Sequence, residues 1–166
     1  MPTNRLIRAV NQSAILRSNP RLRCRPHNLD TVMEYAVGII LGAVISVWTK
    51  AIGFSRDRSF YPTVLIVVAS YYGLFAVISG SMRTLAYEAI PMVVFVGLAV
   101  VGYKRSAWLV AAGLIGHAIF DSFHHHLIEN TGMPVWWPGF CLSIDYTLGA
   151  FLAFYLFRER KHGNAR

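Results

Sequence analysis

Charged residues are scarce in this chain of 166 residues, since Asp, Glu, Lys and Arg together make up only 14% of it. Soluble domains carry about 25%, whereas here 55% of the residues are hydrophobic. Short polar breaks separate several apolar runs of about 20 residues, which is the length that crosses a bilayer as a helix. The low charge therefore excludes an ordinary soluble domain. It predicts an integral membrane protein whose surroundings are the lipid bilayer.

Cysteine is also rare, and acidic residues are missing from the chain before Asp30. The two cysteines are Cys24, near the N-terminus, and Cys141, in the last apolar run, so they form no disulfide framework. Residues 1–32 hold six arginines and one acid, and account for most of the net charge of +8. This basic segment precedes apolar runs instead of forming a basic surface with interleaved aromatic residues, which excludes a nucleic-acid partner.

The predicted fold is all-α, a polytopic bundle of five transmembrane helices over residues 32–157. The spans are expected at about 32–52, 62–81, 85–103, 107–128 and 138–157. Residues 1–31 are predicted to be an arginine-rich tail that is disordered, targeting-like or placed before the true start, for which Met33 is a candidate. Residues 158–166 are predicted to be a basic C-terminal tail. Tyr71 and Tyr72, in the middle of the second span, are interpreted as packing residues.

The distribution of Lys and Arg predicts the orientation. With five spans, nine basic residues fall on one side of the membrane, including Lys50, Lys104 and the C-terminal tail, while the opposite loops carry only Arg83. The positive-inside rule then places the C-terminus in the cytoplasm. We therefore expect a bacterial inner (cytoplasmic) membrane protein whose arginine-rich N-terminal segment is removed or absent.

The most unusual stretch of the sequence is 116–126, which contains four of the six histidines in a segment otherwise predicted to be membrane-buried. On a helix, residues at i, i+4 and i+7 share a face. His117, Asp121 and His124 therefore lie on one face, with His125 at its edge and His126 pointing away. Ionisable side chains at this depth are costly and usually mark function.

Acidic residues from other spans are expected at the same level as these histidines, because the fourth span ends where the third and fifth begin. Glu88 and Asp145 are predicted there without a Lys or Arg at their depth, and Cys141 shares a face with Asp145. A shared divalent cation would resolve this uncompensated charge. The predicted ligands are His117, Asp121, His124, His125, Cys141 and Asp145. The predicted metal is Zn, Fe, Mn or Cu, and a thiolate would favour Zn or Cu. Glu88 and Asp145 are the expected catalytic carboxylates.

The order of these residues resembles that of a family of small bacterial integral-membrane proteins, numbered six thousand and ten among the domains of unknown function. The resemblance covers roughly residues 87–157. It rests on a span with Glu88, a Gly-Tyr-Lys-Arg turn at 102–105, a Trp-Leu pair at 108–109, and the motif His117, Asp121, His124, His125, Cys141 and Asp145. The resemblance implies a membrane protein that uses these polar residues, and it implies no particular reaction.

Several functions fit these features. The first is a metal-dependent membrane enzyme that hydrolyses or oxidises a lipid-like or small apolar substrate. The second is a transporter or channel for protons or metal ions, in which a homo-oligomer would supply the missing symmetry. A haem- or quinone-binding subunit is a third possibility. Bis-histidine haem needs histidines from facing helices, and only one span carries them, so it would require a homo-oligomer or ligation by Met or Cys. A purely structural subunit is the remaining alternative.

Overall fold

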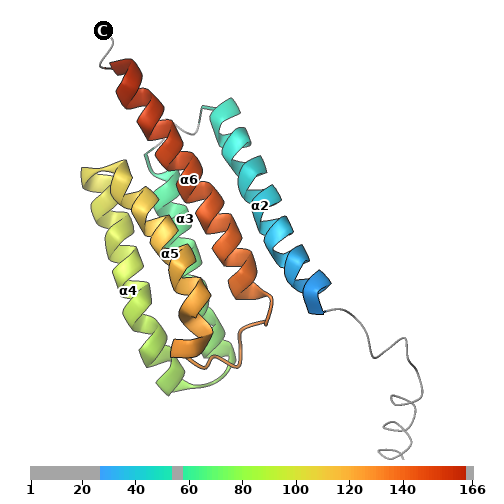
Figure 1. Cartoon of the computed structure of the whole chain (residues 1–166). Coiled ribbons are helices and arrows are strands. Elements are labelled where there is room, and N and C mark those ends of the chain that lie inside the picture. The colour runs from blue at the N-terminus through green and yellow to red at the C-terminus, as the bar shows by residue number, and fades with distance from the viewer. Residues whose placement is uncertain (1–26, 54–57, 164–166) are drawn as a thin grey trace, which may run out of the picture. The chain divides into compact units, whose positions relative to one another are not determined.

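Five long helices account for most of the chain in the computed structural model, which describes residues 27–53 and 58–163. No strand occurs among these residues, so the predicted all-α class is confirmed for them. Figure 1 shows the helices, which are α2 (His27–Ala51), α3 (Phe60–Ile78), α4 (Met82–Arg105), α5 (Ala107–Leu127) and α6 (Trp137–Gly163).

The predicted boundaries differ from the observed ones mainly at the two ends. Helix α2 begins at His27, before the predicted start of the first span at residue 32. The rest of the predicted N-terminal tail lies outside the described residues. At the other end α6 continues to Gly163, so most of the predicted C-terminal tail is helical.

Four of the helices are long and apolar enough to cross a membrane, with candidate spans at Thr31–Ala51, Phe60–Ile78, Met82–Arg105 and Trp137–Lys161. The four apolar helices are compatible with the predicted membrane protein. Helix α5 is not among these spans, so the five-span arrangement is only partly supported. The physical reason is its second half, where three consecutive histidines follow His117 and Asp121 and lower the mean hydropathy.

Serine caps set the sharp turns between successive helices. The hydroxyl of Ser81 accepts a hydrogen bond from the Thr84 amide at 3.1 Å and so caps α4. Ser106 alone separates α4 from α5, and its hydroxyl accepts from the Trp108 amide at 3.3 Å. Gly80 takes a φ of +69°, a backbone conformation that side chains disfavour, in the turn before α4. These short connections make neighbouring helices antiparallel (Figure 1).

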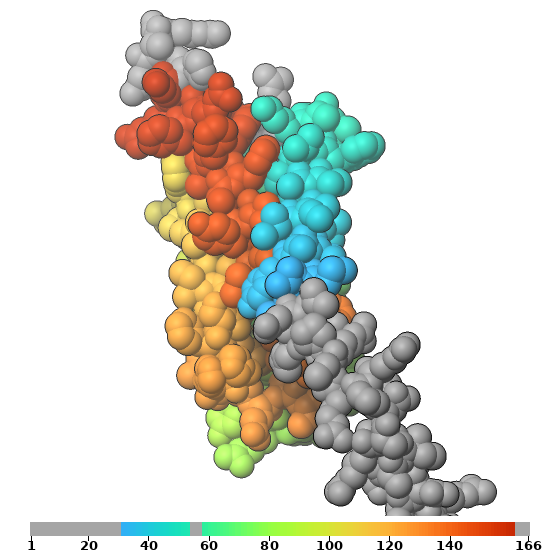
Figure 2. All heavy atoms as spheres, turned by 45° about the vertical axis from the view of Figure 1, so that its right-hand side comes forward, coloured from blue at the N-terminus to red at the C-terminus, as the bar shows by residue number. Residues whose placement is uncertain are grey.

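The antiparallel order brings the end of α5 and the starts of α4 and α6 to the same end of the bundle, as predicted (Figure 1). Helix α5 packs mainly against α6 and α4, and α3 packs against α4 and α5. From Met33 onward, α2 lies along α6, as Figure 2 shows, and a side chain at Gly38 or Gly42 would collide with Ser143 or Thr147 of α6. Helix α5 therefore contacts α3, α4 and α6 along one side and leaves its other side exposed.

The interior of the bundle is apolar in one half and polar in the other. Where α3 and α5 begin, the core is formed by residues such as Leu65, Ala99, Leu114 and Leu148. Among the described residues, the buried charged and imidazole side chains belong to the opposite half, and they are Glu88, His117, Asp121, His124 and Asp145. The apolar half holds the helices together, and the polar half contains the candidate site.

Gly132 in the loop after α5 offers a test of this packing. A Cβ at this position would lie 2.2 Å from the carbonyl oxygen of Phe75, at the end of α3. We expect Gly132→Ala to lower the free energy of unfolding by about 1–3 kcal/mol, because backbone must move to relieve the collision. Thermal unfolding in detergent measures this. Gly97→Ala is the matched control, since nothing lies within 4 Å of its Cβ position, and equal melting temperatures for the two variants would contradict the loop placement.

Candidate metal centre

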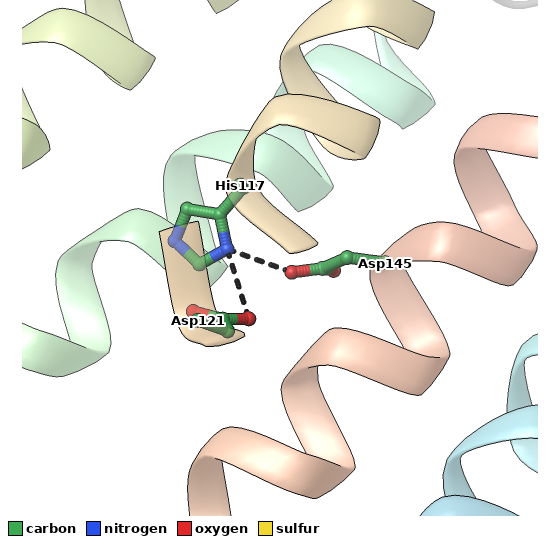
Figure 3. A group of neighbouring side chains, drawn as sticks. All are labelled: His117, Asp121 and Asp145. Atoms are coloured by element: carbon green, nitrogen blue, oxygen red, sulfur yellow. Dashed lines mark hydrogen bonds and ion pairs between the residues drawn. The ribbon is translucent and has the colours of Figure 1, made fainter. Parts of the chain in front are cut away.

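Three buried side chains from two helices converge in the polar half of the bundle. Nδ1 of His117 lies 2.8 Å from Oδ2 of Asp145 and 3.5 Å from Oδ2 of Asp121 (Figure 3). None of the three residues is more than 1% exposed. One ligand atom from each lies within 4.8 Å of the other two, so His117, Asp121 and Asp145 form a group that could hold a metal ion.

Helix geometry explains how these side chains meet. His117 and Asp121 are four residues apart on α5 and therefore project from the same face. Asp145 comes from the first half of α6, which runs antiparallel to α5. The two helices approach closely at Gly149, one turn after Asp145, where a Cβ would lie 2.8 Å from Ile115 of α5. This close approach places the Asp145 carboxylate within hydrogen-bonding distance of the imidazole.

Tyr72 of α3 is part of the site, although its position in an apolar run predicted a packing residue. Its hydroxyl donates a hydrogen bond to Oδ1 of Asp121 at 2.5 Å, and the residue is 2% exposed. Its ring stacks on His124 with a centroid distance of 4.1 Å and lies 5.8 Å from the ring of His117. A tyrosine inside an apolar run gives no signal of such a role, and only the register of α3 against α5 reveals it.

A second polar cluster lies beside the first and contains His124 and Glu88. Nε2 of His124 lies 2.8 Å from Oε1 of Glu88, and both side chains are fully buried. The side-chain amide of Asn130 donates to the same Glu88 oxygen at 2.9 Å and to the Tyr72 carbonyl at 3.2 Å. Sequence reasoning missed Asn130, because a polar residue in a short loop is usually exposed.

The predicted ligand set is therefore divided by the structure. His117, Asp121 and Asp145 come together, whereas His124 pairs with Glu88 and His125 is exposed, with its ring 3.8 Å from that of His126. Cys141 is 1% exposed and lies one turn before Asp145 on α6, but it does not belong to the group of three. Glu88, a predicted catalytic carboxylate, lies in the second cluster. The exposed position of His126 agrees with its predicted direction.

Hydrogen-bond acceptors outnumber donors in both clusters. Seven buried side-chain atoms among the described residues have no hydrogen-bonding partner in the protein, and only one of them, Nε1 of Trp137, is an obligatory donor. The other six are Glu88 Oε2, Asp121 Oδ2, Asp145 Oδ1, Asn130 Oδ1, His117 Nε2 and His124 Nδ1. A cation or additional protons would satisfy this surplus of acceptors.

A groove with a volume of about 410 Å³ reaches the candidate metal centre at Asp121. Its wall includes Glu34 of α2, His125 of α5 and apolar side chains such as Met133, Val135 and Leu142. Asp121 lines the groove even though it is only 1% exposed. The centre is thus buried but lies directly behind an accessible surface.

Comparisons with protein-family models, with the curated proteins and with the solved structures find no match to this chain. The resemblance to the family of small bacterial membrane proteins stays a prediction.

Replacing Tyr72 by Phe tests the link between α3 and the centre. The change removes the hydroxyl that donates to Asp121 and leaves a buried carboxylate oxygen without that donor, so we expect the free energy of unfolding to fall by about 1–3 kcal/mol. Thermal unfolding in detergent measures the loss. Tyr71→Phe is the matched control, because Tyr71 packs on Trp137 and its hydroxyl has no hydrogen bond among the described residues. Equal stability of the two variants would contradict the Tyr72 hydrogen bond.

Proposed function

We propose that the protein is an integral membrane enzyme that binds a divalent transition metal ion through His117, Asp121 and Asp145 and acts on a lipid-like or small apolar substrate. The observation that carries this proposal is the convergence of one imidazole and two carboxylates at a buried position. No Lys or Arg is among the buried residues in the described part of the chain. The carboxylates therefore lack a Lys or Arg partner, and a metal ion would supply positive charge beside them.

The spacing of the donor atoms suits one metal ion. Nitrogen and oxygen ligands bind Zn²⁺ at about 2.0–2.2 Å, so two ligands of the same ion lie roughly 3.0–3.5 Å apart. The distances of 2.8 and 3.5 Å from His117 Nδ1 to the two carboxylate oxygens are close to that range. An imidazole–carboxylate set without a thiolate fits Zn, Fe or Mn and also Cu(II).

Three protein ligands favour catalysis over a structural role. Structural zinc sites are closed by four protein ligands, whereas catalytic sites keep a position open for water or substrate. A bound metal ion supplies Lewis-acid chemistry to such a position. Tyr72 fixes the orientation of Asp121 through its hydroxyl. Glu88 and His124 share a hydrogen bond beside the centre, which fits the acid–base role predicted for Glu88.

The groove at Asp121 supports the choice of substrate. Apolar side chains, including Met133, Val135 and Leu142, form part of its wall, and the polar residues Ser122 and Asp121 lie together on α5. A molecule with an apolar body and one reactive polar group would place that group against Asp121. We also propose that α5 completes a five-span bundle in a bacterial inner membrane with a cytoplasmic C-terminus, because the basic residues gather at that end.

Metal analysis of the purified protein tests the proposal. We expect about one Zn, Fe, Mn or Cu ion per chain in the native protein. His117→Ala should contain less than about a tenth of that, because one of the three protein ligands is lost. His126→Ala is the matched control, since it also removes a histidine from α5 but at an exposed position. Asp145→Asn should lower the metal content with a smaller change in side-chain volume.

Two results would contradict the metal centre. One is the same trace of metal in the native protein and in folded His117→Ala. The other is an equal loss of metal in His117→Ala and His126→Ala, which would indicate adventitious binding to surface histidines. Circular dichroism on each preparation establishes that the variants are helical.

Proton movement is the second candidate, and one observation favours it. Tyr72, Asp121, His117 and Asp145 form a series, with hydrogen bonds of 2.5 Å from Tyr72 to Asp121 and 2.8 Å between His117 and Asp145, and a longer contact of 3.5 Å between Asp121 and His117. Such a series can pass protons between side chains in a membrane. In this case the same residues would form part of a transport path.

Flux measurements on reconstituted vesicles distinguish the two functions. Under the enzyme proposal, native protein gives no more proton or metal-ion flux than empty vesicles. A flux that is present in the native protein and in Ser122→Ala but is lost in Asp121→Asn would indicate that the protein is a transporter and not an enzyme. Ser122 is a suitable control because it is next to Asp121 on α5, and its hydroxyl bonds only to the backbone of its own helix.

A further inference from the structure

A second groove lies at the opposite end of the bundle from the candidate metal centre. Its volume is about 520 Å³, and its wall includes residues at the starts of α3 and α5, at the end of α4 and in the second half of α6. These helix ends meet in the upper part of Figure 1. The apolar core separates this groove from the polar half of the bundle, so it is a different site.

The charge of this groove is positive. The guanidinium groups of Arg58 and Arg105 belong to its wall, together with one acid, Glu159. Oε1 of Glu159 already accepts a hydrogen bond from the Tyr155 hydroxyl at 2.7 Å. Neither arginine forms a salt bridge with an acid in residues 27–53 or 58–163. The groove wall therefore contains two guanidinium groups that have no anionic partner among the described residues.

The groove lies at the level where lipid headgroups are expected, because it is at the ends of candidate spans. Two candidate spans have an end here, since one begins at Phe60 and another ends at Arg105. Tyr103 and Trp108 line the groove and are 50% and 42% exposed, which is typical of side chains in the interfacial aromatic belt. Leu152 and Leu156 of α6 also line it and form an apolar wall below the charged rim. A ligand with an anionic head and an apolar tail would match both the arginines and the apolar wall of the groove.

We propose that this groove binds one anionic phospholipid, with its phosphate between Arg58 and Arg105 and the start of its acyl chains against Leu152 and Leu156. Guanidinium groups bind phosphate oxygens in bidentate geometry, which gives stronger and more directional contacts than a diffuse basic surface. Basic pockets between membrane helices bind anionic headgroups in this way. The apolar wall favours a lipid over a free phosphate ion. This lipid site is independent of the metal centre and does not rest on the proposed enzymatic function.

The test compares two double variants that lose the same charge at the same end of the protein. Arg58→Gln with Arg105→Gln removes the groove cations, whereas Arg160→Gln with Lys161→Gln removes two exposed basic residues of α6 that are not part of the groove wall. Delipidated protein in neutral detergent is titrated with short-chain phosphatidylglycerol or phosphatidylcholine, and thermal unfolding and native mass spectrometry follow binding. Circular dichroism checks that both double variants are helical.

We expect phosphatidylglycerol to raise the melting temperature of the native protein with a saturable curve and one bound lipid, while phosphatidylcholine has little effect. The groove variant should bind phosphatidylglycerol about tenfold or more weakly, the scale expected for two basic side chains at a lipid surface. The control variant should bind like the native protein. Inorganic phosphate should produce no comparable shift.

Three results would overturn the proposal. Equal binding of phosphatidylglycerol and phosphatidylcholine by the native protein would show that an anionic headgroup is not required, independently of the results with the variants. Equal weakening in both double variants indicates a diffuse charge effect. Full stabilisation by inorganic phosphate identifies a site for a soluble phosphate. The native-protein comparison holds even where a groove variant fails to fold.

Discussion

The burial of ionisable side chains without a cationic partner is the constraint on which the rest of the structure depends. Glu88, Asp121 and Asp145 provide three carboxylates, and the two imidazoles of His117 and His124 are equally buried. Each imidazole pairs with a carboxylate at 2.8 Å, and Tyr72 and Asn130 donate further hydrogen bonds. Even with both imidazoles protonated, three ionised carboxylates would leave an excess negative charge. Protons or a metal ion must balance it in an interior of low dielectric constant.

The same constraint explains the role of α5 in the bundle. This helix supplies His117, Asp121 and His124, and it is the one helix of the five that falls short of the apolarity of a membrane span. Its polar face must be covered by α3, α4 and α6, because that face would be unstable against lipid. The close approach at Gly149 brings α6 against this helix, and Tyr72 of α3 and Glu88 of α4 bond to its polar side chains. The site and the packing of the helices are therefore stabilised together.

The sequence predicted the helices and the core of the site, because both depend on regular spacing. Apolar runs indicated the five helices, and the four-residue interval between His117 and Asp121, with the antiparallel order, placed Asp145 beside them. The sequence predicted that Glu88 lies at the level of the histidines, but it did not predict the pairing with His124, because the rotation of α4 depends on packing between helices. Tyr72 and Asn130 were missed for a related reason. A tyrosine in an apolar run and an asparagine in a loop give no periodic signal, and their roles arise from contacts between distant segments.

The division of the interior into an apolar and a polar half bears on the choice between catalysis and transport. A path across the membrane needs polar groups or water along the whole bundle. Here the polar series lies in one half and is reached at Asp121 by a groove. The other half is filled by Leu65, Ala99, Val110, Leu114 and Leu148, each at most 1% exposed. A proton or ion at Asp145 would have to cross this apolar layer to leave on the far side, whereas a substrate could enter and depart through the same groove. The geometry thus favours a site open to one side, and a transporter would require the helices to move apart across the apolar half.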